Sequence, residues 1–160
     1  MPKQKPVTRK AQYAAACVED QLTRSKREHF HGRAKILLQS LDFSQSSARE
    51  LDEENVERLL SSFQLADCLR LDARYHVPAV IDHALLDQAL AQAGASMNDL
   101  RSDDPTRWPT LAFPDGAVIE CLHGQHRVAA ARRYLRKSDQ WWVIDLYSSG
   151  KFFPSSPSPC

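Results

Sequence analysis

The stretch Ala117–Leu135 (AVIECLHGQHRVAAARRYL) constrains the fold more than any other, because its pattern changes from strand-like to helix-like within a few residues. Its apolar start, residues 117–122, predicts a short buried strand. Residues 123–125 (HGQ) predict a tight turn, and a helix is expected from His126 onward. The apolar positions that recur at helical spacing are Val128, Ala131 and Leu135. The stretch therefore predicts a strand–turn–helix unit.

The start of this predicted helix is a candidate anion site. Free N–H groups and the positive end of the helix dipole point out of a helix N-terminus. Arg127 would add a bidentate phosphate donor, and His126 would add a second donor when protonated. The alternative is that Gly124 only makes the turn and that the arginines form a solvated helix face.

The composition is that of one soluble globular domain. The chain has 160 residues, of which 42% are hydrophobic and 26% charged. Because no apolar run approaches membrane-spanning length and no signal-peptide pattern is present, we expect an intracellular protein, nuclear or cytoplasmic, without a membrane partner. The four cysteines are Cys17, Cys68, Cys121 and Cys160. Their scattered positions indicate neither a disulfide framework nor a zinc knuckle.

Charge is distributed unevenly along the chain. Residues 1–35 carry nine Lys/Arg and three Asp/Glu, a net charge of +6, whereas residues 36–160 carry 12 and 17, a net charge of −5. A basic N-terminal arm of this kind can bind nucleic acid or an acidic partner. The alternative is a solvated tail.

The composition predicts a disordered basic tail at residues 1–10 and a disordered Ser/Pro tail at residues 148–160. Residues 11–147 are then expected to form a single domain with an N-terminal helical extension. Helices are expected at 11–22, at 34–41 after a break at Gly32, at 53–63 with Asp52 as N-cap, after Asp82 up to Gly94, and at 97–100. Strands are expected near 68–71 and at 141–147, and Pro114-Asp115-Gly116 predicts a hairpin that pairs 110–113 with 117–122. The order predicts an α+β fold, a small mixed sheet with flanking helices, preceded by N-terminal helices.

Two segments resemble a known superfamily. Residues 49–63 (RELDEENVERLLSSF) resemble the first helix of ParB-type nuclease and CTPase domains, and residues 123–127 (HGQHR) resemble the second nucleotide box of the ParB and sulfiredoxin superfamily. The phrases CLRLD, HVPAVID, CLHGQHR and DQWWVIDLY together resemble an uncharacterised fungal family, a domain of unknown function often carried in large mobile elements. The resemblance covers roughly residues 45–147, and because members of that family are usually much longer, the chain resembles an N-terminal piece or a truncated copy.

The resemblance implies a nucleotide site. Gly124 and Arg127 match phosphate-contact positions, and His126 matches the sulfiredoxin box. Gln125 stands where ParB-type enzymes carry a glutamate and sulfiredoxin its nucleophilic cysteine; an amide is neither a general base nor a useful nucleophile. Arg74 and His76, in the segment that resembles the first box, are expected to help line the pocket.

The sequence therefore predicts a ParB/sulfiredoxin-like module that binds nucleotide (ATP or CTP class) or phosphate without catalysis. One alternative is a phosphotransferase or nucleotide hydrolase of the same fold whose acid is Glu120 or Asp115, and another is a nucleic-acid-binding protein that uses the basic arm. Cys121, His123 and His126 match no zinc spacing, so no metal site is predicted.

Overall fold

The computed structural model describes residues 28–44, 50–114 and 116–149. The chain divides into two units, residues 31–149 and residues 1–30 together with 150–160, and the fold below is that of the first unit. The basic tail, the helix expected at 11–22 and residues 150–160 of the Ser/Pro tail lie outside the described residues.

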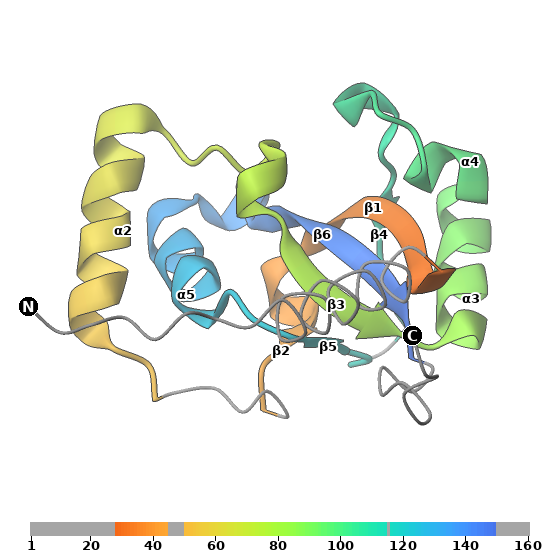
Figure 1. The fold of residues 1–160 in the computed structure, drawn as a ribbon, viewed down its shortest axis with the longest axis horizontal. Helices are drawn as coiled ribbons and strands as arrows, with labels where there is room; N and C mark the ends of the chain where they lie inside the picture. The colour runs from red at the N-terminus through yellow and green to blue at the C-terminus, as the bar shows by residue number, and fades with distance from the viewer. Residues whose placement is uncertain (1–27, 45–49, 115, 150–160) are drawn as a thin grey trace, which may run out of the picture. The chain divides into compact units, whose positions relative to one another are not determined.

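A six-stranded mixed sheet forms the centre of this unit (Figure 1). Its strands are β1 (Phe30–Leu37), β2 (Leu41–Asp42), β3 (Val77–Ile81), β4 (Thr110–Leu111), β5 (Ile119–Cys121) and β6 (Trp141–Ser148), in the spatial order β2-β5-β3-β6-β1-β4. β3 runs parallel to β6 and antiparallel to β5, and the two edge strands β2 and β4 run parallel to β5 and β1. The predicted α+β class with a mixed sheet is confirmed.

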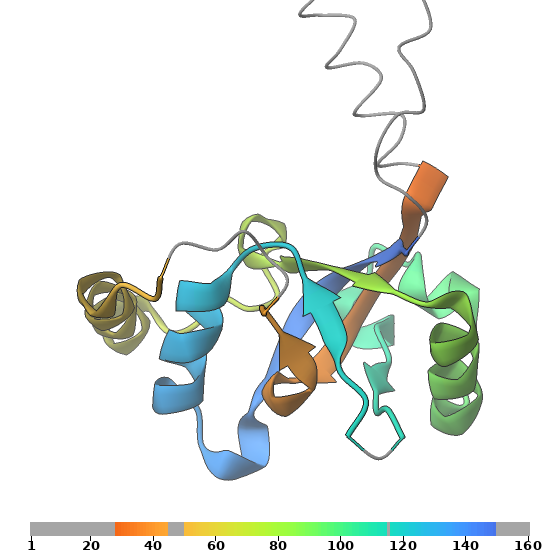
Figure 2. The ribbon, with the colours of Figure 1, turned by 90° about the horizontal axis from the view of Figure 1, so that it is seen from below.

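The sheet curls because β1 and β2 are joined by only three residues, Leu38–Ser40, although three strands lie between them in the sheet. A connection of this length reaches about 14 Å when fully extended. In a flat sheet the two strands would be about 19 Å apart. The sheet edges must therefore bend toward each other, as the view in Figure 2 shows.

Helices cover the sheet at two ends (Figures 1 and 2). They are α2 (Glu53–Ala66), α3 (His83–Ala93), α4 (Met97–Leu100) and α5 (Gln125–Tyr134). α2 lies beside α5 at one end, where it buries Val56 and Phe63, and α3 and α4 lie together at the other. In the described ranges, no helix is long and apolar enough to cross a membrane.

The predicted helix ends are largely confirmed. The Asp52 carboxylate accepts a hydrogen bond from the Glu54 N–H (3.0 Å) and so caps α2. Gly94 closes α3 in a left-handed conformation, with φ 65°. The Asp82 side chain, in contrast, makes no capping bond to α3.

The helix expected at 34–41 is wrong: this segment forms β1, a 3₁₀ turn and β2. Alternate residues Ala34, Ile36 and Leu38 are fully buried, so the two-residue period of a strand overrides the helical spacing of the leucines. Gly32 does not separate two helices but lies inside β1. A Cβ at Gly32 would lie 2.4 Å from the backbone carbonyl carbon of Leu100, so the glycine allows β1 to approach α4 closely.

Two further predictions are wrong. Residues 68–71 form no strand: Arg70 and Leu71 lie in a turn that is closed by a hydrogen bond from the Asp72 N–H to the Leu69 carbonyl (3.0 Å). Strands β4 and β5 do not form a hairpin: β4 pairs with β1, and β5 pairs with β2 and β3. The strand that follows β4 in the chain is therefore not its neighbour in the sheet order. The predicted strand at 141–147 and the predicted helices at 97–100 and from 126 are confirmed within one residue.

Candidate functional site

The turn between β5 and α5 is shaped by Gly124, which precedes the first residue of α5 in a left-handed conformation with φ 99°. A Cβ at this position would come within 2.9 Å of Val77 Cγ2 on the neighbouring strand β3. Both the backbone conformation and the close packing therefore favour glycine. This requirement is satisfied without any ligand, so Gly124 by itself does not distinguish an anion site from a tight turn.

The first turn of α5 consists of Gln125, His126 and Arg127. Their N–H groups have no acceptor within the helix, because the first intrahelical bond of this kind runs from the Val128 N–H to the Gly124 carbonyl (3.0 Å). Gln125 Oε1 is buried and has no hydrogen-bond partner within the described part of the chain. This turn therefore combines free donors with a buried acceptor.

His126 ties this turn to α2. Its Nε2 accepts a hydrogen bond from the Asp52 N–H (2.9 Å), the backbone of the residue that caps α2. An ion pair between Arg133 and Glu53 joins the same two helices further along α5. Because Nε2 must be unprotonated to accept the Asp52 N–H, it cannot at the same time donate to a phosphate.

Arg127 is half-buried and reaches across to the segment before β3. One of its N–H groups donates to the Tyr75 carbonyl (3.1 Å), and its guanidinium carbon lies 5.4 Å from the centre of the Tyr75 ring. No carboxylate of the described residues lies within ion-pair distance of Arg127. Burial lowers the pKa of the guanidinium from its ordinary value, since no neighbouring anion offsets the loss of water.

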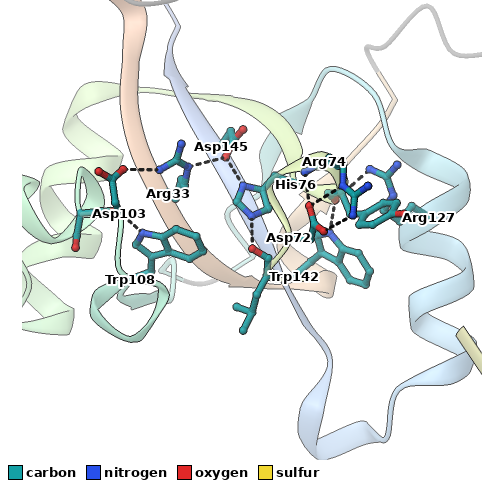
Figure 3. A network of polar contacts seen from close by, with 12 residues as sticks. Arg33, Asp72, Arg74, His76, Asp103, Trp108, Arg127, Trp142 and Asp145 are labelled. Atoms are coloured by element: carbon teal, nitrogen blue, oxygen red, sulfur yellow. Dashed lines mark hydrogen bonds and ion pairs between the residues drawn. The ribbon is translucent and has the colours of Figure 1, made fainter. Parts of the chain in front are cut away.

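Arg74 approaches the same tyrosine from its own segment. Its guanidinium carbon lies 5.6 Å from the centre of the Tyr75 ring. Figure 3 shows Arg74 and Asp72 facing each other. Arg74 is exposed and pairs with Asp72 through two hydrogen bonds, of 3.1 and 2.8 Å, and these bonds hold the pKa of Asp72 at about 2. The structure therefore brings Arg74 and Arg127 together at Tyr75, although 52 residues separate Tyr75 from Arg127 in sequence.

His76 belongs to a separate, buried cluster (Figure 3). Its Nδ1 lies 2.9 Å from Asp145 Oδ1, and its Nε2 lies 3.0 Å from the Leu71 carbonyl. The Asp145 carboxylate also lies 3.8 Å from Arg33 Nε. Because both ring nitrogens of His76 face acceptors, the imidazolium form satisfies both and a neutral ring satisfies one. The nitrogens of His76 are therefore engaged inside the protein rather than beside Arg127.

Sequence reasoning missed Tyr75 and the pairing of His76 with Asp145. Tyr75 acts through its backbone carbonyl, which accepts from Arg127 and also from the Trp142 indole N–H (2.8 Å), and a carbonyl leaves no trace in the residue pattern. Asp145 lies 69 residues from His76. The one available signal was that Asp145 lies inside the apolar run predicted as a strand at 141–147, and that His76 directly precedes a second apolar run, Val77–Ile81.

Two cavities lie near the arginines. The larger, about 630 Å³, is lined by the segment 67–72, the end of α5, Arg136, Asp139 and Trp141. Of its two arginines, Arg70 is paired with Asp139 at 2.8 Å and Arg136 is exposed. The smaller, about 180 Å³, lies between α2, the segment before β3 and α5, and Arg127 is part of its wall. The smaller cavity is therefore the one that adjoins the predicted site.

The residues considered as metal ligands or alternative acids lie apart from this region. Cys121 is fully buried in β5, where burial raises the pKa of its thiol to about 12. Within residues 28–44, 50–114 and 116–149, no three His, Cys, Asp or Glu side chains gather as a metal site. Glu120 faces Asp42 of β2 in the sheet register, and Asp115 and most of the basic arm lie outside the described residues.

Fold and site together define a class: a mixed α+β domain whose curled sheet leads through a glycine turn into a helix with an arginine on its first turn. Within this class, the chain belongs to the family described as "Protein of unknown function (DUF3723) N-terminal domain", whose sequence model matches residues 29–155. The predicted membership of a family of unknown function is thereby confirmed. No curated protein and no solved structure matches the chain, so the likeness to ParB and sulfiredoxin stays a prediction.

Proposed function

We propose that residues 31–149 form a ParB/sulfiredoxin-like module that binds the phosphate of a nucleotide, of the ATP or CTP class, at the first turn of α5. In this proposal the N–H groups of Gln125, His126 and Arg127 meet the phosphate oxygens. The guanidinium group of Arg127 supplies the net positive charge, and Arg74, which is paired with Asp72, adds further N–H donors beside it.

The observation that carries the proposal is the convergence of the two arginines on Tyr75. Asp72 neutralises Arg74, whereas Arg127 has no anionic partner among the described residues, so this small cluster keeps a net positive charge. A half-buried guanidinium without a counter-ion is unfavourable on its own and is stabilised by a bound anion. The free donors of the adjoining helix turn favour an anion in the same region.

Binding without turnover follows from Gln125. An amide neither removes a proton from water nor attacks phosphorus, and the alternative acid Glu120 lies in the sheet opposite Asp42. Gln125→Glu separates this proposal from an inactivated enzyme. In a binding module the new negative charge repels phosphate and weakens binding, whereas in an enzyme of this fold it would restore slow nucleotide hydrolysis.

The direct test is a calorimetric titration of ATP, CTP and inorganic phosphate into the wild type, Arg127→Ala and Arg136→Ala. Arg136 is the matched control because it is an exposed arginine beyond the opposite end of α5. Loss of a charge-assisted hydrogen bond should weaken binding to Arg127→Ala by about ten- to hundred-fold. Equal affinity in all three proteins, each shown to be folded by circular dichroism, contradicts the proposal.

A further inference from the structure

The smaller cavity has a shape and lining of its own. It holds about 180 Å³ between α2, the segment that ends at Tyr75, α5 and β6. Its walls include the aliphatic groups of Leu59 and Ala66, the rings of Phe63, Tyr75 and Trp142, and the Arg127 side chain. An apolar cavity of about 150 Å³ is large enough to hold benzene. The volume therefore suits one planar ring.

The ring surface open to a ligand comes mainly from half-buried Tyr75, with a small part from Phe63, because Trp142 is fully buried behind them. Trp142 is fully buried, and its indole N–H is already used on the Tyr75 carbonyl at 2.8 Å. The Phe63 ring is packed against it, with ring centres 6.0 Å apart. A ligand group placed here would meet ring faces and edges, which favours an aromatic group over a polar one.

The polar part of the wall consists mainly of Arg127. A guanidinium has five N–H donors, and one of those of Arg127 is used on the Tyr75 carbonyl. The one carboxylate in the wall, Asp67, is not paired with Arg127: its Oδ1 accepts from two neutral donors, the Cys68 N–H (2.8 Å) and the Tyr134 hydroxyl (3.3 Å), which orient the carboxylate without cancelling its charge. The cavity thus offers aromatic surface beside a cation whose donors are mostly uncommitted.

The backbone conformation of Asp67 is a separate observation that favours a ligand site at this cavity. It is the one residue other than glycine with a positive φ in the described part of the chain, at φ 64° and ψ 165°. Glycine is nearly the only residue that adopts this region without strain, and residues held there gather at ligand sites. The strained residue stands at the end of α2, in the wall of this cavity.

We infer that the cavity takes the planar aromatic ring of a ligand whose anionic group contacts Arg127. The inference rests on the proposed function where the ligand is a nucleotide, with its base in the cavity and its phosphate at the first turn of α5. An aromatic carboxylate has the same combination of ring and anion, and the experiment distinguishes the two sources.

The test places a larger side chain at the opening of the cavity, so that it occupies the space expected to hold the ring. Ser62 belongs to the wall and is exposed, so Ser62→Phe should block the ring while leaving the first turn of α5 intact. Ser61→Phe is the matched control, because Ser61 is the exposed neighbour outside the cavity wall. Leu59→Phe, from the next helical turn of the wall, serves as a second blocking variant. Thermal melting shows that each variant is folded.

The probes are AMP, CMP, inorganic phosphate and benzoate, each titrated calorimetrically against the wild type and the three variants. For the wild type we expect a nucleotide to bind about ten- to hundred-fold more tightly than phosphate, the usual gain from stacking one base. Ser62→Phe and Leu59→Phe should remove this gain and leave phosphate binding unchanged, and Ser61→Phe should behave as the wild type.

The possible outcomes separate the two proposals. If nucleotide and phosphate bind equally well to wild type and blocked variants, the ring site is wrong and the phosphate site stands. If benzoate alone binds, and Ser62→Phe abolishes this binding, the ring site is supported for an aromatic carboxylate and the nucleotide function is wrong. If none of the four probes binds to the folded wild type, both proposals are overturned.

Discussion

Replacement of Gly124 by alanine should destabilise the protein through two effects that can be separated. At φ 99° an L-residue is less stable than glycine by about 1–2 kcal/mol. The new Cβ would also lie 2.9 Å from Val77 Cγ2, so β3 or α5 must move, and overpacking of this kind costs about 1–3 kcal/mol. The free energy of unfolding should therefore fall by about 2–5 kcal/mol.

A double-mutant cycle with Val77→Ala isolates the steric part. Val77→Ala removes the methyl group that the new Cβ would meet, so Gly124→Ala should cost only its conformational part, about 1–2 kcal/mol, in this background. Gly94→Ala is the control for the conformational part alone. Gly94 also has a positive φ, of 65°, but nothing lies within 4 Å of a Cβ built there.

Urea unfolding followed by tryptophan fluorescence measures the stability of all these variants, because Trp142 is buried in the core and becomes exposed on unfolding. If Gly124→Ala costs the same in the wild-type background and in the Val77→Ala background, within about 0.5 kcal/mol, the two positions are independent and the close packing of the turn on β3 is refuted.

Three substitutions and one thiol-labelling experiment test the remaining parts of the account. Asp52→Ala should lower the free energy of unfolding by about 1 kcal/mol through loss of the α2 cap, and Phe63→Ala by about 3–5 kcal/mol through a core cavity, both measured by urea unfolding. Burial raises the pKa of the Cys121 thiol from 9.0 to about 12. The stability that depends on the protonated thiol is therefore fully present below pH 9 and is lost as the pH rises toward 12. A thiol reagent at pH 8 should label Cys121 only when the protein unfolds. Hydrogen bonds from Arg74 lower the pKa of Asp72 from 3.8 to about 2. The contribution of Asp72 to folding stability is therefore full above pH 4 and is lost as the pH falls through 2. Asp72→Asn should reduce the fall in melting temperature between pH 4 and pH 2, and an unchanged fall would contradict the ion pair.

The parts of the fold that the sequence predicts well are those with local signals. Asp52 and the acidic first turn mark the start of α2, Gly94 marks the end of α3, and the apolar run at 141–147 marks β6. Each of these signals depends on neighbours a few residues apart, so no knowledge of tertiary contacts is needed.

The errors concern elements whose structure depends on distant partners. The leucines at 37, 38 and 41 fit a helical period, but the pairing of β1 with β4 and the close approach of Gly32 to Leu100 select a strand. The Pro-Asp-Gly segment fits a hairpin, but β5 finds its partners in β2 and β3 instead. Pairing between remote strands is the information that a single sequence does not display locally.

The candidate site divides in the same way. The glycine turn and the position of Arg127 on the first turn of α5 follow from the motif itself. The meeting of Arg127 with Arg74 at Tyr75, the bond from Asp52 to His126 and the burial of His76 against Asp145 all join segments at least 52 residues apart. These contacts decide which side chains remain available to a ligand, and only the folded chain displays them.

The most direct measurement of the central claim is a ¹⁵N NMR titration of the protein with inorganic phosphate and then with CTP. A phosphate held at the first turn of α5 should shift the backbone amide signals of Gln125, His126 and Arg127 and the Arg127 side-chain signal, saturably and with one dissociation constant. Amides of the exposed face of helix α3 should not move. Shifts that spread over surface lysines and arginines without saturation, or no shift at residues 125–127, would contradict the phosphate site.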